Sequence, residues 1–74
     1  MLHQHAALRH AKIVCTLGPA TFSRSAIEEL VLKGMDIARL NFSQGDYRTY
    51  QRVIDTVRKI SQKLKKPITI IQDL

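Results

Sequence analysis

Two kinds of hydrophobic spacing alternate along this chain, and their alternation restricts the fold more than any other feature. Segments 13–17, 35–42 and 68–74 have the composition of strands, whereas segments 25–34 and 47–64 carry apolar side chains at helical spacing. The order is therefore strand, helix, strand, helix, strand, with short connections. This order predicts an α/β fold in which parallel strands are joined by right-handed helical crossovers.

Both predicted helices have recognisable start and stop signals. Ser25 and Glu28 have the spacing of a capping box with Ser25 as N-cap, and Gly34 is suited to the position after the last turn. Asp46 is suited to cap the second helix, and Pro67 ends it. The apolar positions at helical spacing are Ile27, Leu30 and Val31 in the first helix and Tyr50, Val53, Ile54, Val57, Ile60 and Leu64 in the second.

The first strand has a composition typical of a sheet interior. Its apolar run from Ile13 to Leu17 is unbroken and stops at Gly18 and Pro19, which predicts a strand buried on both faces. Three parallel strands with two helices leave sheet edges unpaired. We therefore expect the sequence to be part of a larger fold.

The 74 residues allow one small domain and carry an uneven charge. Twelve Lys and Arg residues against six Asp and Glu residues give a formal charge of +6, and seven of the twelve fall between residues 48 and 66. A small basic module that binds nucleic acid or phosphate, without catalysis, is therefore an alternative. A solvated outer face on the second helix explains the same charges, because basic and aromatic residues are not interleaved there.

The remaining compositional signals favour a cytoplasmic protein. Cys15 is the only cysteine, which excludes an intramolecular disulfide and suits a reducing compartment. No apolar run approaches the roughly 20 residues that a membrane span needs. Residues 1–11 are expected to form a flexible arm, in which His3 and His5 are too few to make a metal site.

Polar residues gather at the carboxyl ends of the predicted strands. Arg39, Asn41 and Ser43 alternate along the second strand and share one face, while Asp73 ends the third strand and Thr16 the first. Because the strands are predicted to be parallel, these residues converge at one edge of the sheet. Open α/β sheets and (β/α) barrels bind their ligands at this edge.

The chemistry of these groups suits a phosphate and a hard cation. A guanidinium such as that of Arg39 can hold phosphate oxygens bidentately, and amide, hydroxyl and carboxylate oxygens suit Mg²⁺ or K⁺. Structural roles are possible for the same residues. Arg39 could form a salt bridge with Asp73, and Asn41 and Ser43 could serve as loop and cap residues.

Three segments carry a resemblance to a known family. In order and spacing, "KIVCTLGPAT", "GMDIARLNFSQGD" and "PITIIQDL" resemble the start of the catalytic barrel of pyruvate kinase, over residues 12–74. The resemblance implies a βαβαβ portion of a (β/α)₈ TIM barrel, with strands one to three and helices one and two, that does not close in this chain. It also implies phosphoryl transfer from phosphoenolpyruvate to ADP, giving pyruvate and ATP, with Mg²⁺ and K⁺ and a homotetrameric parent.

The resemblance also assigns roles to individual residues. Arg39 is similar to the arginine that contacts the transferred phosphate. The potassium ligands implied by the family are Asn41, Ser43, Asp73 and the backbone carbonyl of Leu74. The positions near substrate or nucleotide are Thr16, Pro19, Asn41 and Gln44.

The sequence departs from the family in two side chains and in length. Gln44 stands where the family often has histidine, and Leu74 stands where many members carry threonine. A closed barrel takes about 250 residues, and the family's catalytic lysine and its Mg²⁺-binding acidic residues lie further along that barrel. We therefore expect the chain to be an N-terminal fragment that is inactive by itself.

Overall fold

The fold alternates strands and helices in the predicted order. The computed structural model describes residues 11–41 and 46–73, without the side chain of residue 73. The elements are β1 (Val14–Leu17), the 3₁₀ helix η1 (Pro19–Thr21), α2 (Arg24–Leu32), β2 (Ile37–Asn41), α3 (Tyr47–Leu64) and β3 (Thr69–Asp73). The bounds of α3 are those predicted, and η1 adds a short turn that the sequence pattern did not predict.

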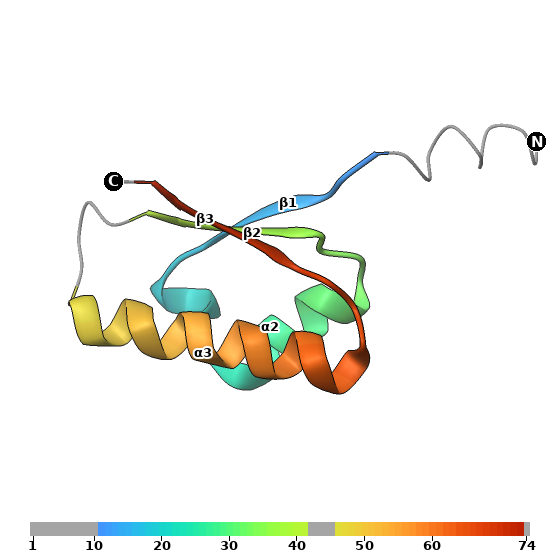
Figure 1. Cartoon of the computed structure of the whole chain (residues 1–74). Coiled ribbons are helices and arrows are strands. Elements are labelled where there is room, and N and C mark those ends of the chain that lie inside the picture. The colour runs from blue at the N-terminus through green and yellow to red at the C-terminus, as the bar shows by residue number, and fades with distance from the viewer. Residues whose placement is uncertain (1–10, 42–45, 74) are drawn as a thin grey trace, which may run out of the picture.

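The three strands form one parallel sheet in the order β1-β2-β3 (Figure 1). In this register Val14 is the neighbour of Ile37, which is in turn the neighbour of Thr69. The prediction of parallel strands is confirmed. Because β2 lies in the middle, β1 and β3 each have one edge without a strand partner among the described residues.

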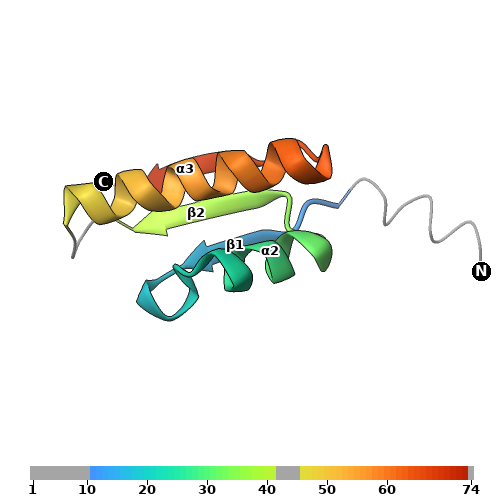
Figure 2. The same cartoon turned by 90° about the horizontal axis from the view of Figure 1, so that it is seen from below.

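Both long helices pack on the same face of the sheet (Figures 1 and 2). The core between them and the strands consists of Leu17, Ile27, Val31, Met35, Ala38, Leu40, Tyr50, Val53, Ile54, Val57 and Ile60, with Leu30, Leu64 and four further hydrophobic side chains partly buried against it. These residues include every apolar helix position that the periodicity predicted.

The prediction that the first strand is buried on both faces is wrong for this structure. Val14 is 53% exposed, because the helices cover only one face of the sheet and nothing in the described chain covers the other. Leu17, on the covered side, is 2% exposed. A continuous apolar run therefore identified the strand correctly, but the second layer that such a run needs is not among the described residues.

The N-cap of α2 is Ser23, and the prediction of Ser25 is wrong. Ser23 keeps an extended backbone, and its hydroxyl accepts a hydrogen bond from the Ala26 N–H at 3.2 Å. Ser25 is already inside the helix. The serine two residues earlier is the last residue outside it, so its side chain is the one that satisfies a free N–H of the first turn.

Gly34 ends α2 in the way that the sequence predicted. Its φ of +114° follows the last helical turn, and its N–H donates to the Val31 carbonyl at 3.0 Å. The next N–H, of Met35, donates to the Leu30 carbonyl at 3.0 Å, which completes a Schellman motif. This closure turns the chain directly into β2.

α3 has a cap at its start and a left-handed residue at its end. The Asp46 carboxylate accepts from the Arg48 N–H at 3.2 Å, as predicted for an N-cap. Lys65 follows the helix with φ of 54°, and the Lys66 N–H donates to the Ser61 carbonyl at 3.0 Å. None of the helices in the described ranges is long and apolar enough to cross a membrane.

Candidate active site

The register places the predicted site residues of the three strands next to one another. Thr16 of β1 is the neighbour of Arg39 on β2, and Asn41 is the neighbour of Asp73 on β3. Asn41 and Asp73 are the last residues of their strands, Thr16 is the last but one of β1, and Arg39 lies two residues before the end of β2. The convergence predicted from the parallel order is therefore present in the backbone.

Arg39 and Asn41 lie on the face of β2 that the helices leave uncovered. Both residues are exposed, whereas Ala38 and Leu40, which alternate with them, are completely buried under the helices. The alternation of the strand thus sends a guanidinium and an amide to the side where no core forms. This explains how a small protein accommodates them without burying a charge.

The turn after β1 lies at the same end of the sheet and is closed by its own hydrogen bonds. The Gly18 N–H donates to the Thr21 hydroxyl at 3.0 Å, and that hydroxyl donates to the Gly18 carbonyl at 3.1 Å. Gly18 has φ of −128°, which any residue can adopt, and a Cβ built on it would meet no atom within 4 Å in the described part of the chain beyond its two neighbours. The fold of this chain does not itself require a glycine here.

Three predicted site residues lie outside the described residues. They are Ser43 and Gln44, which follow β2, and Leu74, which follows β3. Within the described ranges, no three His, Cys, Asp or Glu residues lie close enough to hold a metal ion. In these ranges, the residues with oxygen donors at the ends of β2 and β3 are Asn41, through its amide, and Asp73, whose backbone position alone is described.

The sequence reasoning missed a contact between α3 and the end of β2. The Tyr50 hydroxyl donates to the backbone carbonyl of Asn41, and the Tyr50 ring packs edge-on against Phe22. Tyr50 was predicted only as a core position. The signal that could have suggested more is its hydroxyl, because a buried tyrosine oxygen needs a hydrogen-bond partner.

A second cluster holds the opposite, amino-terminal ends of the strands together. The Asp36 carboxylate accepts from the Ile13 N–H at 2.9 Å and lies 3.5 Å from the Lys66 ammonium, while the Asp36 carbonyl accepts from the Thr69 N–H at 3.0 Å. The hydrogen bond from Ile13, together with the charge of Lys66, lowers the pKa of Asp36. This end of a parallel sheet is associated with stability, and we assign Asp36 that role.

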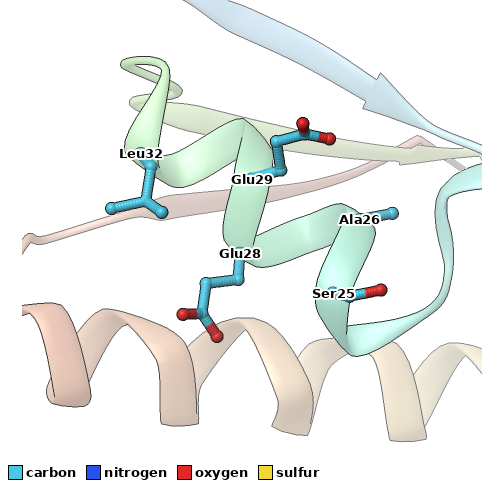
Figure 3. Close-up of a pocket in the computed structure, with 5 residues that line it drawn as sticks. All are labelled: Ser25, Ala26, Glu28, Glu29 and Leu32. Carbon is cyan, nitrogen blue, oxygen red and sulfur yellow. The ribbon is translucent and has the colours of Figure 1, made fainter.

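A surface depression among the described residues lies on α2, away from the strand ends (Figure 3). It has a volume of about 570 Å³ and is lined by Ser25, Ala26, Glu28, Glu29 and Leu32. Figure 3 shows the Glu28 side chain directed toward α3, where Lys63 lies 3.3 Å from its carboxylate. Glu29 pairs with Lys33 at 3.7 Å. Both carboxylates are thus paired, and none of the predicted site residues lines this depression.

Exposed basic residues follow the outer side of α3. They are Arg48, Arg52, Arg58, Lys59 and Lys63, and Asp55 lies among them. Their arrangement on the side opposite the core confirms the predicted amphipathic helix. The alternative function of nucleic-acid binding depended on this basic surface of α3.

The parallel sheet and the helices on one face define a portion of a (β/α) barrel, a fold in which ligands bind at the carboxyl ends of the strands. Residues 8–74 match the family described as "Pyruvate kinase, barrel domain". The chain is 48% identical over 66 residues to a pyruvate kinase of Staphylococcus saprophyticus and 47% identical to one of Staphylococcus aureus. Each match covers 89% of this chain and 11% of the relative.

Solved structures give the same result. Two crystal structures of Cryptosporidium parvum pyruvate kinase align with TM-scores of 0.77 and 0.79, both at 31% identity. They cover 82% and 85% of this chain, and 12% and 13% of the solved chains. This chain belongs to the pyruvate kinase family, in its barrel domain, and spans about one ninth of the length of its curated relatives. The alternative of a basic binding module is not favoured by these matches.

Proposed function

We propose that this chain contributes the phosphate- and cation-binding part of a pyruvate kinase active site. The reaction is phosphoryl transfer from phosphoenolpyruvate to ADP, which gives pyruvate and ATP in glycolysis. The observation that carries the proposal is the exposed pair Arg39 and Asn41 on the uncovered face, with Thr16 and Asp73 as their strand neighbours. Family membership supports this reading of the pair.

Arg39 is proposed to hold the phosphoryl group during transfer. A guanidinium presents several N–H donors in one plane and keeps its charge at any physiological pH. Phosphoryl transfer depends mainly on positioning and on neutralising the charge of the phosphoryl oxygens. Arg39 is the middle residue of β2, the central strand, whose pairing on both sides limits the movement of its backbone.

The donor set at the strand ends fits a monovalent cation. The Asn41 amide oxygen and the Asp73 carboxylate are hard oxygen donors at neighbouring positions, and we propose that Ser43 and the Leu74 carbonyl complete a K⁺ site with them. A bound K⁺ would add positive charge beside the phosphate. The residues that bind Mg²⁺ are proposed to lie in the part of the barrel that this chain does not match.

The turn after β1 is proposed to face the nucleotide, and Thr16, Pro19 and Gln44 are the residues proposed to lie near it. The open space beside Gly18 supports this role, because a ligand can approach its backbone closely. Residues 12–74 are then the barrel portion, and residues 1–11 precede it as an arm. The single Cys15 is consistent with a cytoplasmic enzyme, for which we propose a homotetramer.

The test is substitution of Arg39 in an enzyme that contains this chain and the rest of the barrel. Pyruvate formation from phosphoenolpyruvate and ADP would be followed with and without K⁺. Arg39→Ala should lower kcat by roughly 10²–10³-fold, the usual effect of removing one charge-stabilising donor. Arg39→Lys keeps the charge but loses the planar donors and should recover only part of the rate.

An unchanged kcat for Arg39→Ala would exclude the proposed role of this side chain. The 74-residue chain by itself is expected to be inactive. Measurable ATP formation by the purified chain would contradict that expectation.

A further inference from the structure

Tyr50 connects the two segments that carry the proposed site residues. Its hydroxyl donates to the carbonyl of Asn41, the last residue of β2. The centroid of its ring lies 5.9 Å from that of Phe22, and the two ring planes are inclined at 71°. Phe22 directly follows the η1 turn after β1. One side chain of α3 therefore contacts both the end of the strand that carries Arg39 and the residue that follows the proposed nucleotide turn.

We propose that Tyr50 is a positioning residue for the phosphoryl transfer, an inference that rests on the function proposed above. The hydrogen bond to the Asn41 carbonyl fixes the peptide plane that follows Asn41. This peptide plane lies next to the Asn41 amide that is proposed to bind K⁺. The contact with Phe22 holds the turn after β1 at a constant distance from that strand end.

The helix that carries Tyr50 is a rigid support. Asp46 caps α3 one turn earlier, and Tyr50, Val53 and Ile54 are each no more than 5% exposed. Close packing leaves the ring of Tyr50 little freedom to move. Sites that bind a reacting group lose activity when a supporting residue lets them shift by about 1 Å. Tyr50 meets the requirement for a support that touches no substrate.

Replacement of Tyr50 by phenylalanine tests the hydroxyl alone, because the ring and its contact with Phe22 remain. The matched control is Tyr47→Phe, in the same first turn of α3, since Tyr47 is 74% exposed. Both variants would be made in the complete enzyme. For Tyr50→Phe, the half-saturating phosphoenolpyruvate concentration and the half-activating K⁺ concentration should each rise about three- to tenfold, the usual range for one lost hydrogen bond. Tyr47→Phe should leave both constants unchanged.

A second measurement does not depend on activity. Hydrogen–deuterium exchange of peptides that cover residues 37–46 should be about three- to tenfold faster in Tyr50→Phe and unchanged in Tyr47→Phe. A lower melting temperature with normal exchange and normal constants would mean a packing role only, and would overturn the proposal. Faster exchange with normal constants would also overturn it, because the fixed strand end would then not matter to the site.

The two proposals fail in different ways. A wild-type enzyme that forms no ATP from phosphoenolpyruvate would refute the proposed function. The exchange rates would then decide by themselves whether Tyr50 fixes the end of β2.

Discussion

Two glycines of this chain are predicted to respond oppositely to the same substitution. Gly34 has φ of +114°, a region that costs a residue with a side chain about 1–3 kcal/mol. Its added Cβ would meet Ile13 Cδ1 at 3.1 Å, a small further cost, because Ile13 is 47% exposed and its end can move. Alanine also restricts the unfolded chain more than glycine does, and this effect offsets about 0.4–1 kcal/mol of the loss. Gly34→Ala should therefore lower the free energy of unfolding by about 1–2 kcal/mol.

Gly18→Ala is the matched control, because φ of −128° is open to alanine and no atom of the other described residues, beyond the two chain neighbours, lies within 4 Å of the new Cβ. Only the effect on the unfolded chain remains, so this variant should gain about 0.4–1 kcal/mol. Urea unfolding followed by circular dichroism would measure both. With a slope of about 1 kcal/mol/M, the midpoint should fall by about 1–2 M for Gly34→Ala and rise by about 0.4–1 M for Gly18→Ala. Equal shifts in both variants would refute the reasoning from backbone conformation.

Three further predictions concern stability. Lys65→Gly should raise the free energy of unfolding by about 1 kcal/mol, because φ of 54° suits glycine better than a residue with a Cβ, and an unchanged melting temperature would contradict this. The hydrogen bond from Ile13 lowers the pKa of Asp36, so the ionised carboxylate stabilises the fold above the ordinary carboxyl pKa of 3.8, and this stabilisation is lost as the pH falls through the lowered pKa. Asp36→Asn should therefore flatten the acid side of a curve of stability against pH. A curve identical to that of the wild type would exclude this role. Ile60→Ala removes a completely buried side chain and should lower the free energy of unfolding by about 2–5 kcal/mol, as measured by chemical denaturation. Leu32 is 67% exposed, so Leu32→Ala should lower it by less than about 0.5 kcal/mol. Similar losses in the two variants would be inconsistent with this core.

Local signals predicted the elements of the fold well. The apolar spacing from Tyr50 to Leu64, with Asp46 before it and Pro67 after it, was sufficient to give the bounds of α3. Periodicity works here because one face of the helix packs on the sheet along its whole length. The polar alternation of Arg39 and Asn41 predicted their shared exposed face for the same reason.

Features that depend on several equivalent candidates or on distant partners were not predictable in this way. Ser23 and Ser25 have the same capping chemistry, and the choice between them depends on where η1 ends. The contacts of Tyr50 with Asn41 and of Asp36 with Ile13 join different segments of the chain, so no local sequence pattern predicts them. The exposure of Val14 depends on a covering layer that the described residues do not contain.

The order β1-β2-β3 has a consequence for synthesis on the ribosome. Each strand pairs with the strand that precedes or follows it in the chain, and each connecting helix covers the pair that it joins. Within this region, each new strand therefore pairs with a strand that has already been made, while one edge of β1 has no partner among the described residues. Domains are made from the amino terminus onward, so the β1–α2–β2 unit can assemble before β3 leaves the exit tunnel. Thr16 and Arg39 would then lie on paired strands before Asp73, on β3, is added to the sheet.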